Sequence, residues 1–269
     1  MNRPFFTVIV VTFNPGDKLK DTLESVLSQE FDDYEIIIKD AVSTDGSMET
    51  VPADPRIRLI SRKDQGIYDG MNEGIEAAAG EYIYFLNCGD RLHDNKVLGK
   101  VYEAAGEDET APSGKRILYG DVIEMKTGQH VAANPNMTPF AMFRYLPSHQ
   151  ACFYSRDLFE KRKFDITYRV RADYEHFLWS VMEEGARAEA MPVIIADYEG
   201  GGFSETKENR QVSAEEHRKI TEKYFTGKQL FLYRSYLILT LQPLRQKLAE
   251  NPVTAAVYDR IKNMVYHRA

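Results

Sequence analysis

Long apolar runs alternate with helical patterns through the first hundred residues of the chain. The runs at residues 6–13, 34–39 and 82–86 are rich in β-branched and aromatic residues, which predicts strands buried on both faces. Residues 17–29 place leucine and valine at helical spacing, and a second helical pattern comes shortly before the third run. With a short strand at residues 56–60, this order predicts a parallel sheet with right-handed crossovers.

After about Leu98 the pattern becomes irregular, and the elements that it predicts are of both kinds. They are antiparallel strands at residues 117–125 and 129–133, a strand at 151–154, a helix at 173–184 and a strand at 188–198. The whole pattern predicts an α/β fold with a Rossmann-like, mixed and mostly parallel central sheet that helices flank on its faces.

A run of glycines at residues 200–202 separates these elements from a C-terminal region with helical patterns only. We therefore predict two parts, an α/β domain at residues 1–207 and a C-terminal helical region at residues 208–269. The predicted helices of the second part are 213–225, 229–250, in which Pro243 causes a kink or a break, and 252–267.

The chain has 269 residues and a formal net charge of −7. That length can bury a substantial core, and the acidic balance argues against nucleic acid as the main partner, because a phosphate backbone needs a basic face. Cys88 and Cys152 provide neither a disulfide framework nor a metal-binding spacing, which is consistent with a reducing compartment. The apolar N-terminal run is too short to span a membrane and has no cleavage site, so we expect a cytoplasmic protein.

Polar side chains follow the predicted parallel strands at the points where those strands end. They are Thr12, Asn14, Asp40, Asn87 and Asp90. Each of them alone could cap a turn. The carboxyl ends of parallel strands share one edge of a sheet, where open α/β sheets bind ligands, so together these residues predict a nucleotide pocket. A carboxylate such as that of Asp40 suits the N–H of a base or a ribose hydroxyl.

Three motifs near these strand ends resemble those of one enzyme family. They are Thr12-Phe13-Asn14, the turn Ser43-Thr44-Asp45-Gly46-Ser47 and the run Asp64-Gln65-Gly66-Ile67-Tyr68-Asp69 with Asn72. They are similar to the motifs of family 2 glycosyltransferases with the GT-A fold, above all the bacterial members that build capsule, O-antigen or colanic-acid-like polysaccharide. The resemblance implies that ten residues bind the nucleotide-sugar donor: Thr12, Asn14, Asp40, Asp64, Gly66, Tyr68, Asn72, Asn87, His149 and Gln150.

The run Asn87-Cys88-Gly89-Asp90 stands where most members of that family have Asp-x-Asp, which holds a divalent ion against the donor pyrophosphate. One carboxylate remains here, and Mg²⁺ or Mn²⁺ can be held by one or two carboxylates together with substrate phosphates. The resemblance therefore implies Asp90 as the metal ligand and a divalent cation as the cofactor, bound more weakly than by two carboxylates. The alternative is that Asp90 only caps a following helix near His93.

Two further segments resemble the family. The first is Ser148-His149-Gln150, which implies a role for His149 and Gln150 near the donor sugar or diphosphate. The second contains Asp173, which aligns with the catalytic base. Glu175 is two residues further along the predicted helix, so the two carboxylates point to different faces and only one can be the base. An acidic residue in a first helical turn also complements the helix dipole, which leaves a structural reading open.

The resemblance implies a glycosyltransferase that uses a nucleotide-diphosphate sugar, with UDP expected, and a glycan or polyprenyl-linked acceptor in bacterial surface polysaccharide synthesis. Asp173 would take the proton of the acceptor hydroxyl, and a cation on Asp90 would stabilise the departing diphosphate. A single base and a direct displacement imply inversion at the anomeric carbon. Because one metal-site carboxylate is missing, a non-catalytic protein that binds sugar nucleotides is the alternative.

The C-terminal region differs in charge from the rest of the chain. Residues 229–241 are strongly apolar around Arg234, and basic residues outnumber acidic ones by six to two from Leu230 to Ala269. A basic amphipathic helix can lie on an anionic membrane, which would bring the enzyme to a lipid-linked acceptor at the inner face of the cell membrane. The other reading is a helix that packs on the domain or forms a homodimer.

Overall fold

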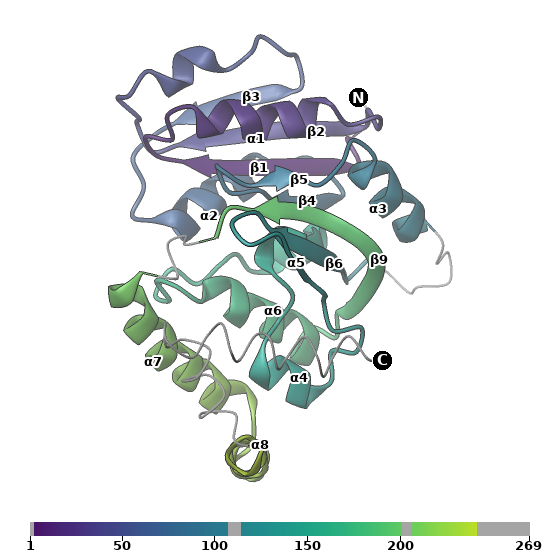
Figure 1. Cartoon of the computed structure of the whole chain (residues 1–269), viewed down its shortest axis with the longest axis vertical. Coiled ribbons are helices and arrows are strands. Elements are labelled where there is room, and N and C mark those ends of the chain that lie inside the picture. Colours follow the sequence, from purple (N-terminus) through teal and green to yellow (C-terminus); the bar gives the residue numbers. More distant parts are fainter. Residues whose placement is uncertain (1–2, 107–113, 201–205, 241–269) are drawn as a thin grey trace. The chain divides into compact units, whose positions relative to one another are not determined.

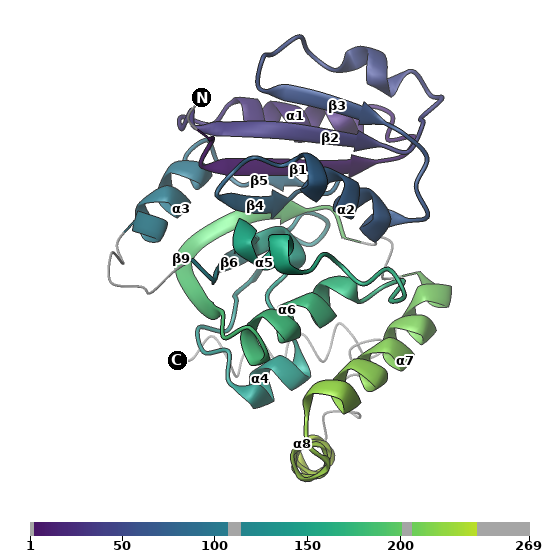
Figure 2. The same cartoon turned by 180° about the vertical axis from the view of Figure 1, so that it is seen from behind.

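The computed structural model describes residues 3–106, 114–200 and 206–240 of the chain. In this part nine strands form one sheet. Figure 1 shows the sheet with helices beside it. Helix α1 (Lys18–Leu27) lies on one face of the sheet and helix α2 (Ile67–Ala77) on the other, which is clear when Figure 1 is compared with the reverse view in Figure 2.

The first half of the sheet follows the predicted pattern. Besides α1 and α2, its elements are β1 (Phe6–Thr12), β2 (Tyr34–Asp40), the 3-10 helix η1 (Ser47–Thr50), β3 (Ile57–Ser61) and β4 (Tyr82–Phe85). Strand β1 pairs in parallel with β2 and with β4, and β2 pairs in parallel with β3. The predicted alternation of strands and helices is therefore confirmed, with ends that differ by one or two residues.

The second half adds further strands and several short helices. Its elements are β5 (Arg91–Leu92), α3 (Val97–Gly106), β6 (Arg116–Glu124), β7 (Gln129–Val131), α4 (Pro139–Arg144), η2 (His149–Ala151), β8 (Cys152–Ser155), α5 (Arg156–Lys161), α6 (Ala172–Met182), β9 (Arg187–Tyr198) and α7 (Lys207–Tyr224). The prediction lacked β5, α3, α4 and α5. Helix α4 has a clear start signal, since Thr138 caps it and Pro139 follows, but six residues are too few to show helical periodicity.

The strand order is β3-β2-β1-β4-β8-β6-β9-β5, and β7 pairs with β6. Strand β8 is antiparallel to β4 and to β6, β5 is antiparallel to β9, and β6 and β9 form a long parallel ladder. The antiparallel pairing expected for residues 117–125 and 129–133 is confirmed as β6 and β7. The mixed sheet is thus as predicted, and its longest ladders are parallel.

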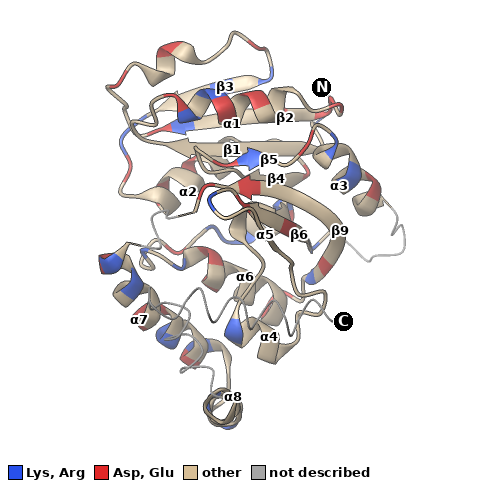
Figure 3. Ribbon diagram, in the orientation of Figure 1, with Lys and Arg blue, Asp and Glu red and all other residues tan. Residues whose placement is uncertain are grey.

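Side chains alternate between the two faces of β1, so each face joins a different helix. Val8 and Val10 belong to the same buried cluster as Leu23 of α1. Ile9 meets α2 at Gly74, where a Cβ atom would lie 2.6 Å from Ile9 Cγ2, so this glycine lets the helix approach closely. Strands β1 and β4 carry no charged residue. The plain colour of β1 can be followed in Figure 3. This packing brings the carboxyl ends of β1, β2 and β4 to one edge of the sheet.

Contacts between residues divide the chain into two compact units, Met1–Ile220 and Thr221–Ala269. Helix α7 begins in the first unit, and the domain division predicted at residue 207 stays a prediction. The glycine-rich loop that suggested this division lies largely outside the described residues.

Helix α8 (Gly227–Leu239) is the last helix of the described residues. It begins at a capping box, in which the side chains of Thr226 and Gln229 each accept a hydrogen bond from the other residue's backbone N–H. It confirms the start of the helix predicted at 229–250; the rest of that helix and the one predicted at 252–267 lie outside the described residues. Within the part of the chain that is described, no helix is long and apolar enough to cross a membrane.

Candidate active site at the carboxyl ends of the strands

Asp40, at the end of β2, is the centre of a hydrogen-bonded turn. Its side chain is buried, and its carboxylate accepts hydrogen bonds from the N–H groups of Val42 and Ser43 and from the hydroxyls of Ser43 (2.5 Å) and Ser61 (2.6 Å). Burial alone would raise the pKa of Asp40, but the hydrogen bonds from Ser43 and Ser61 outweigh it and lower that pKa. Asp40 therefore caps the turn after β2, and its role in donor binding stays a prediction.

Asn14 fastens the loop after β1 to the loop after β2. Its backbone is left-handed, with φ of 47°, its N–H donates to Ser43 Oγ, and its side-chain oxygen accepts from the N–H of Thr44, each at 2.8 Å. Thr12 lies two residues earlier and is buried. The two strand ends thus form one connected edge, which is what the sequence predicts.

Asp64 and Gly66 lead into helix α2. The carboxylate of Asp64 accepts from Nζ of Lys39 at 2.9 Å, and Lys39 is fully buried, with Glu73 at 3.5 Å and the carbonyl of Arg62 accepting at 2.6 Å. Asp64 also accepts from the N–H of Gly66, whose φ of 140° suits glycine. This buried lysine, which the sequence pattern did not single out, fixes the loop that carries Asp64.

Tyr68 and Asn72, both on helix α2, contact the second half of the chain. Tyr68 Oη lies 2.7 Å from Asp173 Oδ1 and 2.8 Å from the carbonyl oxygen of Val170. Asn72 donates to and accepts from the backbone of Phe164. Burial raises the pKa of Tyr68 well above its usual value, and the charge of Asp173 adds to this effect. The Tyr68 hydroxyl therefore stays protonated and can donate to Asp173.

Asp173, in the first turn of helix α6, reaches a cavity, whereas Glu175 does not. The side chain of Asp173 is 30% exposed. Glu175 is completely buried and pairs with Arg162 at 2.7 Å. Of these two carboxylates, Asp173 is therefore the one that can meet a substrate.

Helix α7 supports the start of helix α6 through Glu216. The buried carboxylate of Glu216 accepts hydrogen bonds from the backbone N–H groups of Arg169, Val170 and Arg171, at 2.6 to 3.0 Å. Those three residues directly precede α6, so α7 helps to place Asp173. The sequence gives no signal for this role, because Glu216 looks like any polar position of a polar helix.

His149 lies beside Asp173. Its Nδ1 is 3.9 Å from Asp173 Oδ2, and its ring stacks on Phe85 with centroids 5.2 Å apart. The side chain is 10% exposed, and neither ring nitrogen has a hydrogen-bond partner among the described residues. Burial lowers the pKa of His149, so the ring is neutral at neutral pH. Buried nitrogens without partners are unusual in proteins, and a ligand can use them.

Asp90 is almost fully buried and contacts the segment that contains His149. Its two carboxylate oxygens accept from Nε2 of Gln150 and from the backbone N–H of Glu199, each at 2.9 Å. Burial raises the pKa of Asp90. Because Gln150 directly follows His149, two adjacent residues connect Asp90 with the surroundings of Asp173.

The metal-binding role predicted for Asp90 can be tested against these contacts. In the described part of the chain, no group of three or more His, Cys, Asp or Glu residues is placed to hold a metal ion. Each oxygen of Asp90 keeps a lone pair after its hydrogen bond, and Asn87 Oδ1 is buried with no partner among the described residues. This set fits an ion that is held mainly by substrate phosphates and water.

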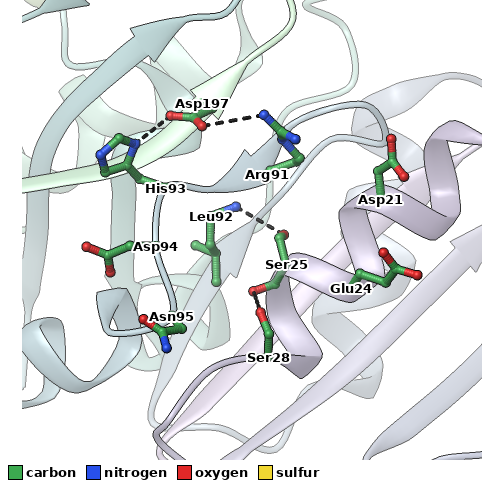
Figure 4. Close-up of a pocket in the computed structure, with 10 residues that line it drawn as sticks. All are labelled: Asp21, Glu24, Ser25, Ser28, Arg91, Leu92, His93, Asp94, Asn95 and Asp197. Carbon is green, nitrogen blue, oxygen red and sulfur yellow. Dashed lines mark hydrogen bonds and ion pairs between the residues drawn. The ribbon is translucent and has the colours of Figure 1, made fainter.

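Two cavities of the first unit differ in lining and in size. The Asp173 cavity, of about 290 Å³, is lined by Asp173 and His149 among others. The Asp197 cavity, of about 530 Å³, is lined by none of the predicted site residues (Figure 4). In it His93 Nδ1 lies 2.6 Å from Asp197, among further acidic side chains on α1. Size therefore does not identify the site, and the smaller cavity contains the predicted base.

Solved structures place the fold in the GT-A class. Mannosyltransferase PcManGT from Pyrobaculum calidifontis, in complex with GDP-Man and Mn²⁺, has a TM-score of 0.61 at 18% identity and covers 98% of this chain and 81% of its own. S. aureus TarS 1–349 in complex with UDP has a TM-score of 0.59 at 16% identity over 72% of this chain, and the match spans 60% of that structure's length. The predicted fold is thereby confirmed.

Sequence comparison then gives the family. Residues 7–168 match the profile described as Glycosyl transferase family 2. The PGL/p-HBAD biosynthesis glycosyltransferase of Mycobacterium bovis is 33% identical over 213 residues, which cover 77% of this chain and 81% of that protein. The chain belongs to glycosyl transferase family 2, as its motifs predict.

Proposed function

We propose that this glycosyltransferase moves a sugar from a nucleoside-diphosphate sugar to a hydroxyl of a glycan or lipid-linked acceptor in bacterial surface polysaccharide synthesis. The observation that carries the proposal is the position of Asp173, the one acidic residue among the described residues that line its cavity, with Tyr68 against one of its oxygens. The M. bovis relative is named as a glycosyltransferase of PGL/p-HBAD biosynthesis, which supports a biosynthetic role. The proposed donor nucleotide is UDP, which is bound in the TarS structure. The alternative is GDP, since PcManGT is in complex with GDP-Man.

In the proposed reaction, the acceptor oxygen bonds to the anomeric carbon while the bond from that carbon to the diphosphate oxygen breaks. The electron pair leaves with the nucleoside diphosphate, and the hydroxyl proton passes to Asp173. Tyr68 occupies Oδ1 of Asp173, so Oδ2, the oxygen nearer His149, takes the proton. A single displacement of this kind inverts the anomeric configuration; NMR of the product that showed retention would contradict it.

The proposed donor side is the edge formed by the strand-end loops, and the proposed cofactor is Mn²⁺ or Mg²⁺. Asp90 would hold the ion together with the side-chain oxygen of Asn87. The bound ion would supply positive charge against the charge that grows on the diphosphate. Gln150 and the backbone N–H of Glu199 hold the Asp90 carboxylate in one orientation.

A thermal-shift titration tests the donor side. The full chain is heated with UDP, GDP, CMP or dTDP, each with and without Mn²⁺, beside Asp90→Asn. We expect UDP with Mn²⁺ to raise the Tm, since a ligand at a hundred times its Kd stabilises the fold by about 2.7 kcal/mol. We expect Asp90→Asn to lose that gain. If GDP raises the Tm and UDP does not, the donor is a GDP-sugar. If a nucleotide raises the Tm but no sugar is transferred to any acceptor, the non-catalytic alternative is favoured.

For the C-terminal region we propose contact with the inner face of the cell membrane. Helix α8 leaves Phe231, Leu232, Ile238 and Leu239 exposed by 62 to 80%. An apolar surface of that kind commonly meets lipid or another protein. We expect the full chain to float with anionic liposomes and a chain that ends at Gly227 to stay behind. If neither floats and the full chain is a dimer in light scattering, the homodimer reading is correct instead.

A further inference from the structure

Apart from Asp173, the charged residues of the described chain that line the Asp173 cavity are both arginines. Arg144 and Arg171 line it, whereas the chain as a whole has a net charge of −7. We propose that this cavity binds acceptors that carry an oxyanion, a phosphate or a carboxylate, and that Arg144 and Arg171 bind that oxyanion. The proposal rests on the proposed function, because it takes the cavity of the base as the acceptor site.

Arg171 is anchored at one end of its guanidinium. Its Nε donates to the carbonyl oxygen of Ser213 at 3.0 Å and to Ser213 Oγ at 2.8 Å, and the group lies 5.5 Å from the ring centroid of Tyr174. Neither terminal nitrogen has a hydrogen-bond or ion-pair partner in the described part of the chain. An arginine held in this way has little side-chain freedom left to lose, and its two Nη groups suit a planar or tetrahedral oxyanion.

Arg144, the last residue of α4, is held by aromatic rings instead of by a carboxylate. Its guanidinium lies 5.7 Å from the ring centroid of Phe140 and 5.3 Å from that of Tyr145. Among the described residues it has no hydrogen bond and no ion pair. Stacking leaves the edge of the guanidinium, with its N–H groups, free to donate.

Most other arginines of the described residues are neutralised. Nine of them pair with a carboxylate within 4.0 Å: Arg56, Arg62, Arg91, Arg116, Arg156, Arg162, Arg169, Arg187 and Arg234. Arg144 and Arg171 share a cavity with Asp173, yet neither pairs with it. The two charges are therefore available to a ligand.

His149 adds an independent sign that a ligand belongs here. It lines the same cavity, is nine-tenths buried, and has two ring nitrogens without partners among the described residues. An acceptor hydroxyl at Asp173 Oδ2 would lie close enough to use one of them, because His149 Nδ1 is 3.9 Å from that oxygen. The cavity thus offers a base for the hydroxyl and, around it, two cations for an anionic group on the same molecule.

The test measures binding of small anions to the full chain by isothermal titration, with UDP present at saturation so that the donor side is filled. The probes are methyl phosphate, methyl glucuronide and, as the matched neutral sugar, methyl glucoside. We expect at least one anion to bind about tenfold or more tightly than the glucoside. The anion that does so tells a phosphate-bearing acceptor from an acidic glycan. If both bind no better than the glucoside, the proposal is wrong.

Arg144→Gln and the double variant with Arg171→Gln should weaken anion binding by about tenfold or more, as expected for charge-assisted hydrogen bonds. Arg91→Gln is the control, since Arg91 lines the Asp197 cavity and pairs with Asp197 (Figure 4). Arg144 is exposed, so its substitution tests the idea even if Arg171→Gln does not fold. An unchanged Kd for the anion in Arg144→Gln would overturn the proposal. A higher Kd for UDP in this variant would also overturn it, because that result assigns the arginines to the donor.

Asp173→Asn separates this proposal from the proposed function. If it keeps anion binding and loses sugar transfer, both are supported. If it keeps sugar transfer, the assignment of the base fails, while the titrations still decide whether the arginines bind an oxyanion.

Discussion

The polar groups around Asp40 have their hydrogen bonds satisfied within the described part of the protein, whereas those around Asp173 do not. The carboxylate of Asp40 is filled by N–H and hydroxyl donors of its own loop and of Ser61. Asp173 receives one hydroxyl, from Tyr68, and the neighbouring His149 has no partner among the described residues. The first group supports the loops at the proposed donor edge, and the second keeps hydrogen-bonding capacity that a substrate can use.

The strongest test of this contrast is Asp173→Asn. An amide cannot take the proton of the acceptor hydroxyl, so we expect kcat to fall by about a thousandfold, within the range for general-base catalysis. The Tm and the Kd for the nucleotide should change little, since Asp173 is partly exposed and lies outside the strand-end loops. Steady-state kinetics beside a thermal-shift titration make the measurement. Full activity in this variant would remove Asp173 from the mechanism.

Asp40→Ala should act on stability instead. Its loop donors would lose a charged acceptor in a buried place, and we expect the free energy of unfolding to fall by about 3 kcal/mol in urea titrations. Because the pKa of Asp40 is lowered on folding, its contribution is present above the unfolded pKa of about 4 and disappears as the pH falls through the folded value. The stabilities of wild type and variant should therefore converge in acid. Asp17→Ala, at an exposed site near the same edge, is the control.

The smallest effect, and the sharpest, is expected from His149→Phe. Phenylalanine keeps the stack on Phe85 and removes two buried nitrogens without partners, so we expect the variant to be about 1 kcal/mol more stable and less active. The pKa of His149 is lowered by burial against the opposing charge of Asp173, so wild-type stability falls as the pH drops below the unfolded value of about 6.5. The stability gained by His149→Phe over the wild type should therefore increase as the pH falls from 7 to 5.

His176→Phe provides the matched control for that variant. His176 is also buried, with a pKa lowered to about 3 by burial, but its Nε2 lies 2.9 Å from the carbonyl oxygen of Arg162. Replacing it leaves that carbonyl without its partner, so this variant should be less stable. If both substitutions destabilise equally, buried nitrogens without partners cost the fold no more than hydrogen-bonded ones.

The sequence predicted the half of the fold that depends on long apolar strands. Periodicity found β1, β2 and β4, because strands buried on both faces have few alternatives. It also placed Asn14 and Asp40 at one edge, since parallel strands end together. Short elements such as α4, with six residues, and β5, with two, were not predicted, because they are too short to show a periodic pattern.

Contacts between distant segments explain what the sequence did not predict at the site. Lys39 lies within a strand pattern, and its burial against Asp64 depends on how the next loop folds back. Glu199 reaches Asp90 through a backbone N–H, which every residue but proline has. Arg144, at the end of α4, and Arg171, at the start of α6, look like surface arginines until the fold brings these two helix ends to one cavity.

The hydrogen bonds of Glu216 imply that the enzyme can be inactivated without being unfolded. Three backbone amides before helix α6 depend on one carboxylate of α7, and a largely exposed helix opens at a lower free energy than a buried central sheet. Mild heat should therefore release Asp173 from its place while the sheet is still intact. Hydrogen exchange at Arg169, Val170 and Arg171 would then follow the loss of activity, well below the melting of β1 and β2.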